Sequence, residues 1–167
     1  MKEGISLTIQ FIILVAVQVL FFNQIHLFGF GCIFLYVLFI INYPFERNKF
    51  QLLFSGFLLG FTIDLFSQSY GIHAFATTLI TYLRPFIIKF YTGLNDLEAL
   101  KKTYSGFGII YYRYAIIMVF IHHFTLFLLE AFSFKYVFPI IFRTAISTIL
   151  TMIFIFFVQS ILVKRKS

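Results

Sequence analysis

Long apolar runs fill this chain, and most of its charged residues fall between the runs. Each run is close to the roughly 20 residues that a helix needs to cross the apolar layer of a membrane, which is about 30 Å thick. Six runs can be drawn, at residues 5–22, 27–43, 51–66, 71–88, 109–129 and 137–163. The pattern predicts an all-α, polytopic membrane protein with about six transmembrane helices, in a single transmembrane domain over residues 1–167. The third and fourth runs are short, so a tight buried helical hairpin is the alternative for that pair.

The composition agrees with a membrane protein and argues against a water-soluble one. Apolar residues make up 61% of the chain and charged residues only 11%, whereas about a quarter of a typical soluble domain is charged. The net charge of +7 would suggest nucleic acid as the partner of a soluble protein, but here most basic residues lie at the ends of the apolar runs. We therefore expect contact with membrane lipid and none with nucleic acid.

The basic residues are divided unevenly between the two sets of loops. The terminal segments and the loops after the second and fourth runs contain Lys2, Arg47, Lys49, Lys89, Lys101, Lys102, Lys164, Arg165 and Lys166. The other set of loops contains Lys135. Because Lys and Arg in short loops favour the cytoplasmic side, both termini are expected in the cytoplasm. Arg84 and Arg113, near the cytoplasmic ends of their runs, are expected to anchor the protein at the interface.

Gly56, Gly60 and Asp64 follow one another at intervals of four residues in the third run. On a helix this spacing places them on one face, and two glycines so placed let a second helix approach closely in lipid. Gly56 and Gly60 are therefore predicted to line a helix-packing surface. The carboxylate of Asp64 is expected to point into the protein, because a charge near the end of a span is costly unless it meets a partner or water.

Three further polar residues are expected near Asp64, at the outer ends of their runs. His73 lies in the first turn of the fourth run, where it can form a hydrogen bond with Asp64 across the hairpin. Glu130 ends the fifth run, and Arg143 lies about one and a half turns into the sixth, where a guanidinium needs a carboxylate or a path to the interface. We predict that these four residues form a buried polar cluster with a structural role, in preference to a proton relay or a ligand site.

The sequence offers little for catalysis or metal binding. His122 and His123 are adjacent, so on a helix their side chains point about 100° apart and do not easily share one metal ion. The H-E-x-x-H pattern of zinc proteases is absent. Cys32 is the single cysteine, which excludes an intramolecular disulfide and a cysteine metal cluster. We therefore predict no catalytic residue, no metal and no cofactor.

Three short motifs lie in the stretch 56–85. They are Gly56-x-x-x-Gly60-x-x-x-Asp64, Gly71-Ile72-His73-Ala74 and Tyr82-Leu83-Arg84-Pro85. Together with the small size, the six short runs and the basic loops, they resemble the rod-shape-determining MreD family. The resemblance implies a non-enzymatic subunit of the elongasome, the complex that directs lateral peptidoglycan synthesis, and therefore a location in the bacterial cytoplasmic (inner) membrane. It also implies MreC, the MreB cytoskeleton, and a RodA-type glycan polymerase with its transpeptidase as partners, and a fold similar to the substrate-binding subunits of energy-coupling-factor vitamin transporters.

That similarity in fold supplies the alternative function. A substrate-binding subunit of a vitamin importer is also a small, six-span protein without catalytic residues. It would need a polar pocket near the outer face, which the predicted cluster could line. Such a subunit should also offer small residues on its first span to its transporter partner, whereas the run 5–22 has only Ser6 and Ala16 for this purpose. The wall-synthesis function is therefore favoured.

Overall fold

A computed structural model of the chain describes residues 2–25, 31–44, 48–92, 109–132 and 136–164. Within these ranges the chain forms α-helices, one 3-10 turn and connecting segments, and no β-strand, which confirms the all-α class for this part of the chain. The elements are α1 (Lys2–Leu20), η1 (Phe22–Gln24), α2 (Val37–Ile41), α3 (Lys49–Ser67), α4 (Ile72–Thr92), α6 (Ile109–Ala131) and α7 (Val137–Lys164). Several residues behind the predicted orientation lie outside the described residues: Arg47, Lys101, Lys102, Lys135, Arg165 and Lys166.

Long helices occupy five of the six predicted runs. In the described part of the chain, four helices are long and apolar enough to cross a membrane: α1 continued into η1, α3, α6 and α7. α4 has 21 residues, but Arg84 and Lys89 make it less apolar than these four. Large apolar side chains face outward on the long helices, as Ile12 of α1 and Phe156 of α7 do. Such a surface suits contact with lipid tails better than contact with water.

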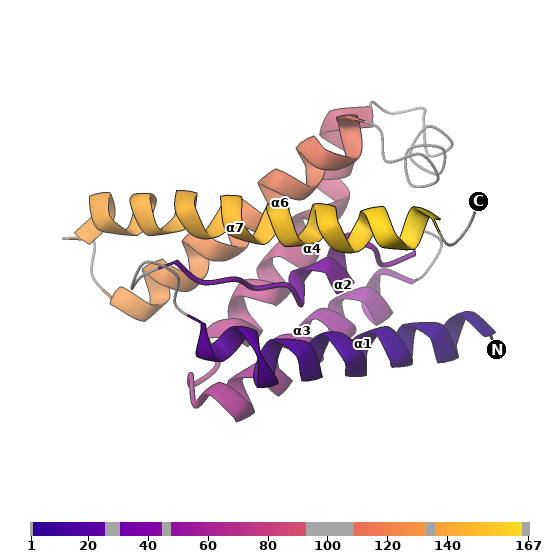
Figure 1. The fold of residues 1–167 in the computed structure, drawn as a ribbon, viewed down its shortest axis with the longest axis horizontal. Helices are drawn as coiled ribbons and strands as arrows, with labels where there is room; N and C mark the ends of the chain where they lie inside the picture. Colours follow the sequence, from indigo (N-terminus) through magenta and orange to yellow (C-terminus); the bar gives the residue numbers. More distant parts are fainter. Residues whose placement is uncertain (1, 26–30, 45–47, 93–108, 133–135, 165–167) are drawn as a thin grey trace.

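The second predicted run does not form a long helix. Within it α2 covers only five residues, and the residues 32–36 that precede it are not helical. Segment 31–44 instead extends across the molecule between α1 and α7 (Figure 1). Every residue from Gly31 to Ile41 is buried. The prediction of a transmembrane helix at 27–43 was therefore wrong for residues 31–43, because contacts with other helices decide the conformation of this segment. The count of about six transmembrane helices is not confirmed, since four helices of the described residues are long and apolar enough to cross a membrane.

Hydroxyl groups of α7 accept the backbone hydrogens at the start of the segment. The N–H of Cys32 donates to Ser147 Oγ at 3.0 Å, and the N–H of Phe34 donates to Thr151 Oγ1 at 3.2 Å. Both hydroxyl-bearing residues are fully buried. A buried backbone N–H without a partner would cost about as much free energy as a lost hydrogen bond. These two residues therefore make the extended conformation possible.

Side chains from α1, α4 and α6 bind carbonyl groups of the same segment, the last through the hydroxyl of Tyr114, which donates to the carbonyl oxygen of Ile41 at 3.4 Å. Gln18 of α1 donates through Nε2 to the carbonyl oxygen of Ile33 at 3.0 Å. Arg84 of α4 donates through Nη2 to the carbonyl oxygen of Tyr43, and through Nε to the hydroxyl of Tyr114 on α6 at 3.0 Å. Arg84 is 2% exposed, so the prediction that it anchors the protein at the interface was wrong. Its guanidinium instead holds the end of the buried segment.

The chain passes repeatedly from one end of the molecule to the other. α1 begins and α7 ends at the same end (Figure 1), as an even number of passes requires. The buried segment supplies the second pass, in the opposite direction to α1. Its side chains form much of the core, which also includes residues of α4, α6 and α7.

Candidate functional site

α3 and α4 form a closely packed hairpin, and two glycines lie at their contact surface. A Cβ atom on Gly56 would lie 2.2 Å from Thr81 Oγ1. A Cβ atom on Gly60 would lie 2.1 Å from Thr77 Oγ1 and 2.4 Å from the carbonyl oxygen of His73. These distances are too short for any side chain larger than that of glycine. Gly56 and Gly60 thus allow the two helices to approach this closely.

Asp64, in the last turn of α3, caps the first turn of α4. Its Oδ1 accepts hydrogen bonds from Ser69 Oγ at 2.5 Å and from the N–H of His73 at 3.0 Å, and its Oδ2 accepts from the N–H of Ala74 at 2.8 Å. A carboxylate at a helix N-terminus satisfies backbone donors and interacts favourably with the helix dipole. Asp64 is 6% exposed, and these bonds provide the partners that its buried charge needs. Asp64 therefore contacts the backbone of His73 rather than its imidazole.

Tyr36 joins two histidines of different helices in the core. Its hydroxyl lies 2.7 Å from Nδ1 of His73 on α4 and 2.8 Å from Nε2 of His122 on α6. All three residues are buried. A phenol hydroxyl donates one hydrogen bond and accepts others, so Tyr36 donates to one imidazole and accepts from the other. The bridge fixes the orientation of both rings.

His123 belongs to a separate set of hydrogen bonds. Its Nδ1 donates to the carbonyl oxygen of Val119 at 2.7 Å, and its Nε2 lies 3.1 Å from the hydroxyl of Thr151, which also accepts from the backbone of Phe34. His122 and His123 therefore do not converge on one point. Among the residues that the structure describes, no group of three or more His, Cys, Asp or Glu side chains is placed to hold a metal ion.

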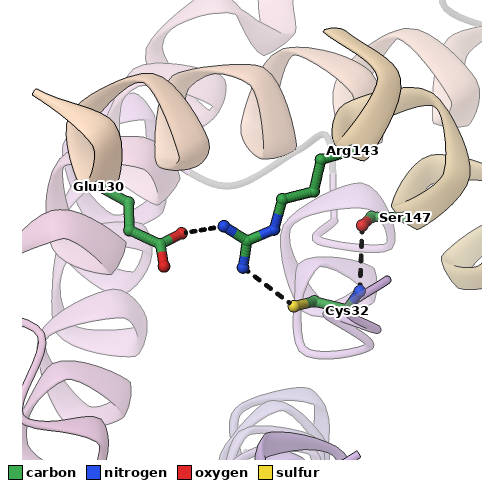
Figure 2. A network of polar contacts seen from close by, with 4 residues as sticks. All are labelled: Cys32, Glu130, Arg143 and Ser147. Atoms are coloured by element: carbon green, nitrogen blue, oxygen red, sulfur yellow. Dashed lines mark hydrogen bonds and ion pairs between the residues drawn. The ribbon is translucent and has the colours of Figure 1, made fainter. Parts of the chain in front are cut away.

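Glu130 and Arg143 form an ion pair between α6 and α7 (Figure 2). Arg143 Nη1 lies 2.8 Å from Glu130 Oε2, and Nη2 donates to Cys32 Sγ at 3.6 Å. The guanidinium also lies 4.1 Å from the centre of the Phe127 ring, within the range of a cation–π interaction. The Glu130 side chain is 48% exposed. The prediction of a buried cluster was therefore wrong for Glu130, because the end of α6 brings its carboxylate to the surface.

A pocket of about 580 Å³ lies at the end of the bundle away from the start of α1. Its walls come from the end of α1, η1, the segment before α2, the turn between α3 and α4, and the adjoining parts of α6 and α7. The polar residues that line it include Asn23, Ser67, Ser69, His73, Glu130 and Arg143. Three of the four residues of the predicted cluster therefore border one pocket. Asp64 is not part of the lining, and its carboxylate is bonded to the turn beside it.

Several residues of these networks were missed by the sequence analysis: Gln18, Tyr36, Ser147 and Thr151. A signal existed for α7, where Thr144, Ser147, Thr148 and Thr151 repeat at intervals of three and four residues in an otherwise apolar run. That stripe marks the face turned toward the interior. Gln18 and Tyr36 are isolated in apolar runs, so no pattern pointed to them.

Searches of the chain against protein-family models, curated proteins and solved structures found no match. The pocket combines hydrogen-bonding groups, one ion pair and apolar side chains, among them Phe22, Phe34 and Leu126. Pockets of several hundred Å³ with a few converging polar groups on apolar walls are typical of sites that bind small amphipathic molecules.

Proposed function

We propose that this protein is a non-enzymatic membrane subunit of the bacterial elongasome, similar to MreD, and that it supports cell shape and lateral peptidoglycan synthesis by binding partner proteins. The proposed partners are MreC, the MreB cytoskeleton, and a RodA-type glycan polymerase with its transpeptidase. The protein acts in the inner membrane with both termini in the cytoplasm.

The observation that supports this proposal is that the residues of the resemblance form one structural unit. Gly56 and Gly60 bring α3 against α4, and Asp64 caps the start of α4. Arg84, near the other end of α4, binds the carbonyl oxygen of Tyr43. Each of these motif residues has a specific contact within the same hairpin or with the segment beside it.

We also propose that all six apolar runs cross the membrane, the second as a mainly non-helical segment. Non-helical backbone is tolerated at membrane depth where it is buried in protein. Segment 31–41 meets that condition, since all its residues are buried. Six crossings agree with α1 beginning and α7 ending at the same end of the molecule (Figure 1).

The test is purification of the tagged full-length protein in mild detergent, followed by identification of the proteins that bind it. We expect MreC-like and RodA-like proteins to be enriched over their recovery with an unrelated six-span protein expressed at the same level. Depletion of the protein should make rod-shaped cells round. Recovery of a transporter ATPase module in place of wall-synthesis proteins would overturn the proposal.

The pocket favours a second candidate, the substrate-binding subunit of an energy-coupling-factor vitamin transporter. Such a subunit needs a ligand site at one end of its helices, and the pocket of about 580 Å³ has that position. The exposed face of α1 argues against it, because it presents large residues such as Ile5, Ile9 and Ile12 in place of a small-residue groove. Uptake of labelled vitamins by cells with and without the protein separates the two candidates.

A further inference from the structure

A core histidine borders the pocket at the end of the bundle and keeps one ring nitrogen accessible. His73 borders the pocket although only 6% of its surface is exposed. Its Nδ1 is bonded to Tyr36, and Nε2 has no hydrogen-bond partner among the residues that the structure describes. A polar atom of a buried side chain that meets a pocket is available to a ligand.

The direction of the hydrogen bonds through Tyr36 determines whether Nε2 of His73 is a hydrogen-bond donor or an acceptor. His122 contacts Tyr36 through Nε2, and its Nδ1 is buried without a partner. A buried N–H without an acceptor costs more free energy than a buried acceptor nitrogen without a donor. The proton of His122 therefore lies on Nε2 and is donated to Tyr36, which in turn donates to Nδ1 of His73. In a neutral imidazole the other nitrogen then bears the hydrogen, so His73 presents an N–H donor to the pocket.

A balanced pair of charges lies on another wall of the same pocket. Arg143 and Glu130 are 2.8 Å apart and are 29% and 48% exposed. A guanidinium has five donors and a carboxylate about four acceptor positions, so each can bind a ligand group without breaking the pair. The ring of Phe34 lies 5.3 Å from His73 and 6.3 Å from Phe127, over which Arg143 is placed. The apolar rings of Phe34 and Phe127 therefore lie between the imidazole of His73 and the ion pair of Arg143 with Glu130.

We propose that this pocket binds a zwitterion with a phosphodiester and a primary ammonium group, the chemistry of a glycerophosphoethanolamine headgroup. The ammonium contacts Glu130, the phosphate contacts Arg143, and an oxygen farther along the ligand accepts the hydrogen of His73 Nε2. The ion pair has no net charge and neither has the ligand, so each charged group of the ligand meets a group of opposite charge and no net charge is added to the pocket. The pocket lies at one end of the apolar helices, which is the depth of lipid headgroups in a membrane. The proposal does not depend on either candidate function above.

Cys32 provides a reporter of occupancy, because it is the single cysteine of the chain and, although only 7% exposed, borders the pocket, so that a reagent in the pocket modifies it slowly. The full-length protein is placed in nanodiscs of phosphatidylcholine, alone or with equal amounts of phosphatidylethanolamine or phosphatidylglycerol. The rate at which N-ethylmaleimide modifies Cys32 is measured, and bound lipid is counted by native mass spectrometry. Soluble glycerophosphoethanolamine, added to the phosphatidylcholine discs, tests whether the headgroup binds without acyl chains.

We expect phosphatidylethanolamine to slow the modification about tenfold, as one charge-assisted hydrogen bond to the ammonium implies. Phosphatidylcholine, whose ammonium has no hydrogen to donate, and the anionic phosphatidylglycerol should give no such protection. Glu130→Gln should remove the effect, and Lys89→Gln, which removes an exposed charge near the other end of α4, should not. Protection by the soluble compound would identify a free ligand, and protection by the diacyl lipid alone would identify a lipid.

Equal modification rates in all lipids and with the soluble compound would overturn the proposal, as would full protection in Glu130→Gln. If Glu130→Gln lowers the unfolding temperature, the comparison of lipids on the wild-type protein decides alone. Co-purification of wall-synthesis proteins is unaffected by these outcomes, so failure here is distinguishable from failure of the proposed function.

Discussion

One methyl group added at Gly56 or Gly60 is expected to destabilise the protein, with the larger effect at Gly60. At Gly56 the three atoms nearest to the new Cβ all belong to the side chain of Thr81, whose Oγ1 would be 2.2 Å away. At Gly60 it would also meet backbone, with the carbonyl oxygen of His73 at 2.4 Å and Cα of Ala74 at 2.6 Å. Ordinary contact begins at 3.4 Å. A side chain can rotate away at the first site, whereas α3 and α4 must separate at the second.

The magnitude follows from opposing contributions. Overpacking a well-filled site costs about 1–3 kcal/mol, while alanine in place of glycine stabilises a helix by about 0.5–1 kcal/mol. Rotation of Thr81 also breaks the 2.6 Å hydrogen bond from its Oγ1 to the carbonyl oxygen of Thr77, which contributes about 0.5–1.5 kcal/mol. We therefore expect a net loss of about 1–2 kcal/mol for Gly56→Ala and about 3 kcal/mol for Gly60→Ala.

The assay is the free energy of unfolding of the protein in detergent micelles, obtained from denaturant titration. Thr81→Ala removes the clashing atoms, so it should cancel most of the effect of Gly56→Ala in the double variant. Thr77→Ala should not rescue Gly60→Ala, because the backbone clash remains. Phe57→Leu, on the exposed face of α3, is the matched control. Tolerance of Gly60→Ala equal to that of Phe57→Leu, or its full rescue by Thr77→Ala, would refute the reasoning.

Three further predictions concern orientation, assembly and the core. Reporters fused after Ser167 and within residues 95–102 should lie in the cytoplasm, and one near Ser69 should lie outside, because basic residues favour the cytoplasmic side. An external C-terminus would contradict the six proposed crossings. Asp64→Asn places an amide N–H against a backbone N–H donor of α4. We therefore expect lower recovery of MreC-like partners in co-purification and rounder cells under the microscope. Unchanged recovery and cell shape would argue against this role of Asp64. Tyr36→Phe leaves two buried imidazoles without their shared hydroxyl and should cost about 1–3 kcal/mol in unfolding free energy; an unchanged value would mean that the bridge does not stabilise the core.

The hydrophobic pattern predicted the long helices well. The run 109–129 became α6 (Ile109–Ala131), and the run 51–66 became α3 (Lys49–Ser67). These helices make their backbone hydrogen bonds internally, so local sequence is enough to specify them. The spacing of Gly56 and Gly60 likewise points to one helix face, since both residues belong to a single regular element.

The conformation of the second run cannot be predicted from its local sequence alone. Residues 32–36 are as apolar as a helix that spans a membrane, yet their backbone is bonded to groups more than a hundred positions away, as from Cys32 to Ser147. No periodicity within the run can report such partners. The part of the pocket wall that this segment supplies, Cys32 and Phe34, was unpredictable for the same reason. Glu130 and Arg143 were expected near Asp64, but the extended segment with Phe34 keeps the two halves of the predicted cluster apart.

The buried segment also constrains the order in which the protein can be made. It leaves the ribosome long before α7, whose Ser147 and Thr151 accept the backbone hydrogens of Cys32 and Phe34. Until then those N–H groups have no acceptor from α7, and each such group in the apolar layer costs several kcal/mol. The segment therefore waits for the last helix in a shielded or transiently helical form. We therefore expect a chain that stops near residue 131 to leave the N–H groups of Cys32 and Phe34 without these acceptors and to fold less stably than the full chain.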